Sequence, residues 1–149
     1  MSRSLTLFAV ALTAGLALSL GCDTGPSKAD QEDAALASTE PVAVRSIQKD
    51  YEANEVGADV KYKGKRFLLT GTVQEISKDF LDDIYITLVG TSEWATVHAY
   101  FSEADTPTIA ELKKGQKITF YGTVDGFTVG SAMIKKCKFW QEPAIVPAS

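Results

Sequence analysis

The sequence has little of what most catalytic and metal-binding sites need. It contains one histidine, His98, and two cysteines, Cys22 and Cys137, that lie far apart in the chain. Because zinc sites use sets of three or four Cys, His or carboxylate ligands, the sequence predicts no metal site and no cofactor. It also lacks a glycine-rich phosphate loop, a nucleophile elbow and a Ser-His-Asp pattern. These absences predict a protein that is not an enzyme and has no catalytic residues.

The chain also lacks an excess of positive charge. Its 19 acidic residues outnumber its 15 basic residues, which gives a formal net charge of −4. General binding of nucleic acid depends on Lys and Arg side chains that neutralise phosphates, so this composition disfavours nucleic acid as a partner. Two basic clusters, within residues 61–66 and 135–138, are better explained as solvated turns and edge strands than as contacts with anionic lipid.

No uncharged run is long and apolar enough to favour a membrane-spanning helix, which needs about 20 apolar residues. The longest run covers residues 4–21, and Thr and Ser side chains interrupt it. It follows Arg3 and is rich in Leu, Ala and Val, as in a secretory signal peptide. We therefore predict a signal peptide over residues 1–21, with a spanning helix as the alternative.

The end of this run, Ser19-Leu20-Gly21-Cys22, resembles the lipobox of bacterial lipoproteins. The resemblance implies that the Cys22 thiol carries acyl chains such as palmitate, that the signal peptide is removed, and that Cys22 becomes the N-terminus. Each buried methylene of such chains contributes about 0.8 kcal/mol to membrane binding. The implied location is the cell envelope, as a membrane-anchored lipoprotein facing the periplasm. The choice between inner and outer membrane stays open.

Residues 22–41 contain almost no large apolar side chain, which predicts a flexible tether between the anchor and the folded domain. Acylation of Cys22 would leave Cys137 as the single thiol, so we expect no intramolecular disulfide. A lone cysteine in an apolar segment is usually a small buried hydrophobic residue, and we expect this of Cys137.

Hydrophobic periodicity predicts a folded domain over residues 42–140, followed by a tail over residues 141–149. Val44, Ile47 and Tyr51 recur at helical spacing, which predicts one amphipathic helix of roughly 12–16 residues that ends near Gly57. Thr106-Pro107 predicts the N-terminus of a second, short helix. Alternation with a period of two predicts five strands, the last with a bulge. These strands lie within residues 67–74, 84–88, 96–101, 118–124 and 131–140.

A short repeat links the first and fourth predicted strands, because Gly71-Thr72-Val73 recurs as Gly122-Thr123-Val124. Glycine inside a strand usually marks a bend or a bulge. Two long strands that each bend at a glycine suit a small closed barrel.

Five short strands with a helix between the third and the fourth form the pattern of an OB-fold barrel. Several segments also resemble the bacterial tRNA_anti-like OB-fold family, whose members are often lipoproteins. These segments are Tyr51-Glu52-Ala53-Asn54-Glu55-Val56, Lys61-Tyr62-Lys63-Gly64-Lys65, Gly71-Thr72-Val73, Leu112-Lys113-Lys114-Gly115-Gln116-Lys117 and Ile134-Lys135-Lys136-Cys137. The resemblance covers about residues 44–140 and implies a mostly β, five-stranded OB-fold barrel with an N-terminal helix. It carries over no catalytic or binding residue.

OB-folds usually bind ligands on the outer face of their second and third strands. The residues predicted to point outward there are Tyr85, Thr87, His98 and Tyr100. Aromatic rings on this face can stack on bases, sugars or peptide side chains, with base stacking contributing about 1–3 kcal/mol per base. The alternative is structural: Tyr85 and Tyr100 stabilise the sheet as a cross-strand pair, or the helix that begins at Val44 covers them.

The sequence thus supports two functional hypotheses that use the same face. The lipobox and the absence of catalytic groups favour an anchored, non-enzymatic module that binds a protein, a peptide or a small envelope ligand. The alternative is single-stranded nucleic-acid binding, as the family name suggests. The acidic net charge and the predicted export both argue against that alternative.

Overall fold

The structure is a computed structural model that describes residues 25–141 of the 149-residue chain. Cys22, the predicted signal peptide and residues 142–149 of the predicted tail lie outside the described residues. The strands are β1 (Val42–Ala43), β2 (Arg66–Lys78), β3 (Ile84–Leu88), β4 (Val97–Phe101), β5 (Lys117–Thr128) and β6 (Ser131–Phe139). The helices are α1 (Lys28–Leu36), α2 (Val44–Ala53), α3 (Glu55–Tyr62), the 3-10 turn η1 (Glu103–Asp105) and α4 (Thr106–Glu111).

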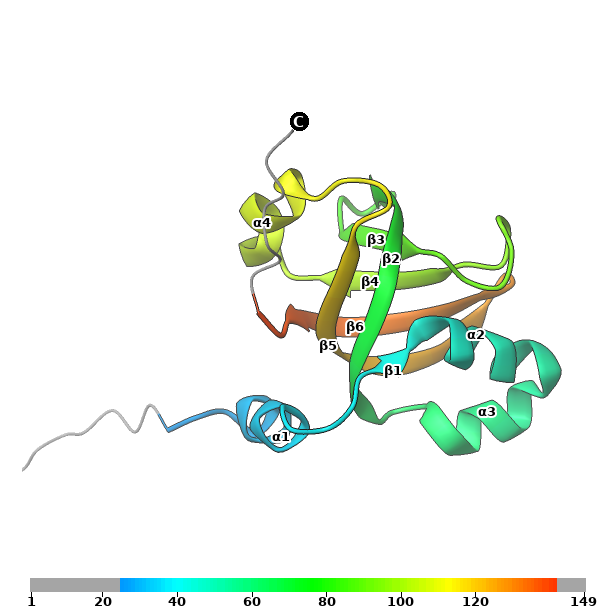
Figure 1. The fold of residues 1–149 in the computed structure, drawn as a ribbon, viewed down its shortest axis with the longest axis horizontal. Coiled ribbons are helices and arrows are strands. Elements are labelled where there is room, and N and C mark those ends of the chain that lie inside the picture. The colour runs from blue at the N-terminus through cyan, green and yellow to red at the C-terminus, as the bar shows by residue number, and fades with distance from the viewer. Residues whose placement is uncertain (1–24, 142–149) are drawn as a thin grey trace, which may run out of the picture.

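The strands form a closed five-stranded barrel, which confirms the predicted fold class (Figure 1). The sheet order is β1-β2-β3-β4-β6-β5, and β5 closes the barrel by pairing with β2. Strand β1 is an addition to the prediction. It pairs in parallel with β2, Val42 opposite Leu69, and is too short to produce a periodic signal in the sequence.

The long strand β2 pairs with two different strands along its length. Its residues 66–72 pair with β5 and its residues 73–78 pair with β3, so the change of partner falls between Thr72 and Val73, close to Gly71. A Cβ atom at Gly71 would lie 2.8 Å from Cγ2 of Val44, and one at Gly122 would collide with Ile134. Close packing inside the barrel therefore requires both glycines.

The barrel interior and α2 share one hydrophobic core. Val44, Ile47 and Tyr51 are each at most 2% exposed and belong to the same cluster as Leu69 and Phe120. Removing a side chain such as Ile47 from water contributes roughly 1.5–3 kcal/mol. Helix α2 is fixed at one end of the barrel by apolar burial.

The single predicted helix after residue 42 is wrong in one respect, because the chain forms two helices there. The break falls at Asn54, whose side-chain oxygen accepts a hydrogen bond from the Gly57 N–H at 3.0 Å and caps α3. Asparagine competes with the helix backbone in this way and favours N-cap positions. Gly57 lies within α3, which continues to Tyr62.

The flexible tether predicted over residues 22–41 also needs correction, because residues 28–36 form α1. Ser27 caps this helix in a capping box with Asp30, in which each side chain hydrogen-bonds the other residue's backbone N–H. Asp33 of α1 is only 5% exposed and pairs with Arg66 of β2. The low apolar content of this segment does not predict α1, because the helix is stabilised by its capping box and by an ion pair.

The predicted bulge in the last strand is confirmed. The pairing of β6 shifts between Ile134 and Cys137 relative to β4, and Lys136 has a φ of 52°. The shift allows Ile134 and Cys137, which have opposite parity in the sequence, both to be buried. It also turns the Lys136 carbonyl toward Arg66.

The short helix α4 lies between β4 and β5, as predicted. It starts slightly earlier than the sequence indicates, because Thr106 is its first residue and Asp105 occupies the N-cap position. Gly115 has a φ of 87° in the connection to β5, a conformation that glycine adopts without strain.

Candidate functional site

Strands β3 and β4 bring the four predicted face residues together. Tyr85 lies opposite Tyr100, and Thr87 lies opposite His98. The residues that alternate with them, such as Ile86 and Ala99, are fully buried in the barrel core. Because side chains alternate along a strand, the four predicted residues share the outer face of the barrel.

Three aromatic rings form a continuous stack on this outer face. The Tyr85 and Tyr100 ring centroids are 5.3 Å apart with an interplanar angle of 29°, and the Tyr85 and His98 centroids are 5.1 Å apart. All three side chains are half-buried, whereas Thr87 is 8% exposed. The cross-strand pair expected under the structural alternative is therefore present, and its rings remain partly accessible.

Helix α2 does not cover the aromatic stack. Its buried side chains Val44, Ile47 and Tyr51 enter the core at the barrel end, and Tyr85 and Tyr100 keep part of their surface exposed. The alternative in which the helix that begins at Val44 covers this face is therefore wrong.

His98 is held in a neutral, hydrogen-bonded state. Its Nε2 lies 3.3 Å from the Thr96 hydroxyl, which in turn lies 3.2 Å from the Ser131 hydroxyl. Burial lowers the pKa of His98 below its usual value of 6.5. At neutral pH the imidazole therefore offers a ring for stacking and carries no positive charge.

The face extends beyond the predicted residues onto β2 and β6. Glu75 and Ser77 of β2 lie opposite Thr87 and Tyr85, and Met133 of β6 lies opposite His98. The alternation within the last strand is ambiguous in the sequence and does not place Met133 on this face. The parallel pairing of β4 with β6 is a tertiary contact that single-strand periodicity does not reveal.

Acidic groups border the face. Burial raises the pKa of Tyr100, and the negative charges of Asp79 and Asp83 in the β2–β3 loop raise it further. Lys135, which bears on Tyr100 from β6, is paired with Asp125 at 2.9 Å. The negative charges around the stack therefore disfavour binding of an anionic ligand.

The two basic clusters are largely paired with acids. Three residues of the first cluster, Lys61, Lys63 and Arg66, and two of the second, Lys135 and Lys138, form ion pairs. Their carboxylate partners are, respectively, Asp50, Asp59, Asp33, Asp125 and Asp30. Most of these pairs are exposed, but the Arg66 and Asp33 side chains are 9% and 7% exposed. Sequence reasoning missed this buried pair, although the Ser27-x-x-Asp30 spacing marks the helix that carries it.

Cys137 is buried in the core, as expected, with its Sγ 3.6 Å from the Ile134 carbonyl oxygen. Burial raises the pKa of the thiol well above its usual range, so it stays protonated. Within residues 25–141 no group of three or more His, Cys, Asp or Glu side chains is placed to hold a metal ion. Across the same described residues no helix has the length and apolar character needed to cross a membrane.

Comparison with known proteins agrees with this architecture. Residues 3–138 match the profile of the tRNA_anti-like family. The chain belongs to the tRNA_anti-like family. No curated protein matches the chain.

Among solved structures, this tRNA_anti-like protein is similar to a Klebsiella pneumoniae protein with the provisional name "nucleic acid-binding lipoprotein". The two share 19% sequence identity with a TM-score of 0.59, over 72% of this chain and 96% of the other. At that identity the likeness shows the fold. A weaker likeness, with 15% identity and a TM-score of 0.40 over 60% of this chain and 88% of the other, is to an OBody bound to hen egg-white lysozyme.

Proposed function

We propose that this chain is a lipid-anchored, non-enzymatic protein of the bacterial cell envelope that binds a protein, a peptide or a small envelope ligand. The proposed ligand surface is the outer face of β3 and β4. The observation that carries the proposal is the half-buried stack of Tyr85, His98 and Tyr100. Tyrosine is enriched at binding interfaces because its ring is apolar and its hydroxyl group remains hydrogen-bonded.

The charge around the stack supports the choice of ligand. Asp79 and Asp83 bear on Tyr100, Glu75 lies on the neighbouring strand, and His98 is neutral at pH 7. A phosphate backbone would meet like charge here, whereas a basic peptide would meet complementary charge and an apolar peptide would meet no repulsion. These electrostatics favour a protein or peptide.

Anchoring of the chain is supported by the lipobox-like segment that ends at Cys22. Acyl chains at that position would hold the domain on a membrane facing the periplasm. The name of the Klebsiella pneumoniae neighbour also includes the word lipoprotein. Palmitate release from the purified protein, and its loss in a Cys22→Ser variant, would test this part of the proposal.

Single-stranded nucleic-acid binding is the second candidate. The family name and the name of the neighbour favour it, and aromatic rings can stack on bases of any sequence. Such binding would weaken steeply with salt, because phosphate contacts release counterions. Fluorescence anisotropy with a labelled single-stranded oligonucleotide at two salt concentrations would detect it.

The deciding experiment is photo-crosslinking in the bacterium that makes the protein. A photoreactive phenylalanine replaces Tyr100, and a matched control carries the same probe at Val56, which is 77% exposed on α3. We expect a discrete protein or small-molecule adduct from position 100 and none from position 56. Nucleic acid in the adduct would favour the second candidate, and identical adducts from both positions would contradict a specific face.

A further inference from the structure

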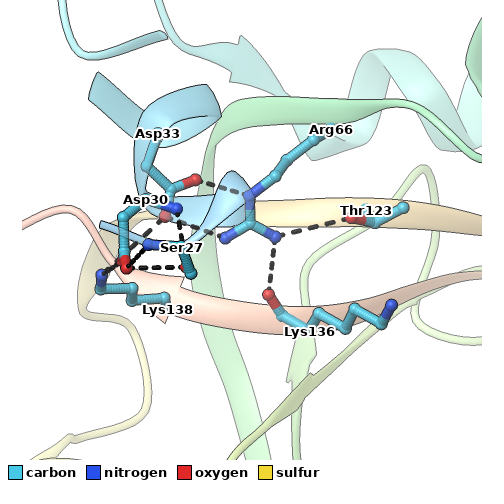
Figure 2. A network of polar contacts seen from close by, with 7 residues as sticks. All are labelled: Ser27, Asp30, Asp33, Arg66, Thr123, Lys136 and Lys138. Carbon is cyan, nitrogen blue, oxygen red and sulfur yellow. Dashed lines mark hydrogen bonds and ion pairs between the residues drawn. The ribbon is translucent and has the colours of Figure 1, made fainter. Parts of the chain in front are cut away.

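Helix α1 places a carboxylate on a guanidinium group of the barrel (Figure 2). Arg66 donates from Nε to Oδ1 of Asp33 at 2.5 Å and from Nη2 to Oδ2 at 3.1 Å. This two-point geometry is the one by which Arg binds carboxylate or phosphate groups. Asp33 is the single buried residue of α1.

A second charge pair lies beside the first. Lys138 of β6 donates to Oδ1 of Asp30 at 2.8 Å, and its Nζ lies 4.0 Å from Oδ2 of Asp33. Hydrogen bonds from Lys138 and Ser27 lower the pKa of Asp30 to about 2. Two cations of the barrel therefore face two carboxylates of α1.

The barrel itself orients the guanidinium group of Arg66. Nη1 donates to the Lys136 carbonyl oxygen at 2.8 Å and lies 3.5 Å from the Thr123 hydroxyl, and Cζ lies 5.9 Å from the centroid of the Tyr121 ring. These contacts come from β5 and β6 and do not involve α1. The Nε and Nη2 edge would keep its outward orientation if α1 left, which is the preorganisation that an oxyanion site requires.

Helix α1 is held on the barrel by few apolar contacts and can undock from it. Apart from Asp33, its residues are exposed or, in the case of Leu36, half-buried, so little apolar surface holds it. Its contacts are mainly ionic, and they resemble the contacts that an anionic ligand would make. The capping box allows the helix to keep its N-terminus satisfied on its own.

We propose that Arg66 and Lys138 form a phosphate-binding site on the outer face of β2 and β6, which α1 occupies with Asp33 and Asp30. The ligand is a phosphate monoester or free phosphate, because one such group carries about as much negative charge as the two carboxylates it replaces. Two adjacent cations suit one phosphate group better than the extended backbone of a nucleic acid. The site is separate from the β3–β4 face and does not rest on the function proposed for that face.

Hydrogen exchange of the full chain, as purified from the expressing cells, tests the proposal without any substitution. We expect sodium phosphate to accelerate exchange of the backbone amides in residues 28–36 over sodium chloride of equal ionic strength, and to leave α2 unchanged. The acceleration should saturate, as binding at one site requires. Equal exchange in both salts would overturn the proposal.

Variants then assign the site. Asp33→Asn weakens the contact between α1 and Arg66, so the apparent affinity of this variant for phosphate should be about tenfold higher than that of the wild type. Glu32→Gln removes one charge from an exposed position on the same helix and should behave like the wild type. Adding Arg66→Lys to Asp33→Asn should abolish the gain, because lysine keeps the charge and lacks the two-point geometry. A gain that Glu32→Gln shares would contradict the assignment, and thermal melting of each variant checks that it is folded.

Vesicles identify the source of the phosphate group. Phosphatidylcholine vesicles with phosphatidic acid present a phosphate monoester at a lipid surface, and vesicles of phosphatidylcholine alone are the control. Acceleration of α1 exchange by the first vesicles assigns a lipid headgroup, and acceleration by soluble phosphate alone assigns a free ligand. If a single-stranded oligonucleotide releases α1 and both phosphate probes are inert, the proposed ligand class is wrong.

Discussion

The barrel has two outer faces that differ in what covers them. On β3 and β4, Tyr85 and Tyr100 stack on each other and stay half-exposed, with acidic groups nearby. On the face of β2 and β6, with β5 between them, Tyr121 is 6% exposed beside Arg66, and an acidic helix of the same chain lies over the guanidinium group. The aromatic face is therefore accessible to a partner, whereas a helix of the same chain covers the other face.

The two faces also differ in the physical basis of their contacts. The first consists of rings that favour apolar and aromatic contacts, while the second pairs buried charges of opposite sign. A buried charge pair costs desolvation, so it adds little net stability, yet removing one partner is expensive. The face under α1 should therefore respond strongly to charge substitutions, and the aromatic face should not.

The largest expected effect comes from Arg66→Leu. The substitution removes the cation that docks Asp33 and leaves the Lys136 carbonyl without its donor, so α1 should undock and the free energy of unfolding should fall by about 2 kcal/mol. Chemical denaturation measures the change. Lys63→Leu is the matched control, because it breaks an exposed pair with Asp59 and should cost less than about 1 kcal/mol. Equal losses would remove the distinction between the buried and exposed pairs.

A smaller effect is expected from Ser27→Ala, which removes the N-cap of α1. Loss of such a cap costs about 1 kcal/mol, or roughly a fivefold increase in hydrogen exchange of the α1 amides. Ser46→Ala, at an exposed position of α2, is the control and should leave α1 unchanged. Exchange in β3 and β4 should not change in either variant, because α1 does not contact the aromatic face.

A smaller effect still is expected from the tyrosine pair itself. A double-mutant cycle with Tyr85→Leu and Tyr100→Leu should give a coupling energy of about 0.5 kcal/mol, as cross-strand pairs on a half-exposed surface do. Tyr85→Leu combined with Val56→Ala provides the additive control, since the two sites share no partner. A coupling energy of several kcal/mol would mean that the main role of the two rings is to stabilise the sheet and not to bind a ligand.

The smallest expected effect is the response of His98 to pH. Because the folded-state pKa of His98 lies below 6.5, the unfolded chain takes up this proton first. The contribution of His98 to stability is therefore fully present above pH 6.5 and is lost as the pH falls through that value toward the folded pKa. NMR titration of this single histidine should give a midpoint below 6.5. A midpoint above it would mean that an unrecognised anion faces the ring.

The sequence was sufficient for the barrel because the alternation in β3 and β4 places their apolar residues in the core. Ile86, Leu88, Val97 and Ala99 are all fully buried, as their parity predicts. The face residues follow from the same alternation. Periodicity fails where contacts are polar or tertiary, and the break between α2 and α3 at Asn54 depends on one hydrogen bond from the Gly57 N–H.

Helix α1 shows the same limit more clearly. Its apolar content is low, and its docking depends on Asp33 meeting Arg66, a residue 33 positions away in the sequence. No local pattern reports such a pair. The capping box at Ser27 was the available signal, and it predicts a helix start without predicting where the helix packs.

Hydroxyl-radical footprinting of the purified full chain, read by mass spectrometry, tests the difference between the two faces most directly. Tyr100 and Tyr121 have the same side-chain chemistry and both lie on the outer surface of the barrel, so their oxidation rates report the cover over each face. We expect Tyr100 to be oxidised faster than Tyr121, and Asp33→Asn to raise the rate at Tyr121 alone. Equal rates in the wild type, or no change at Tyr121 in the variant, would contradict a covered face beside an open one.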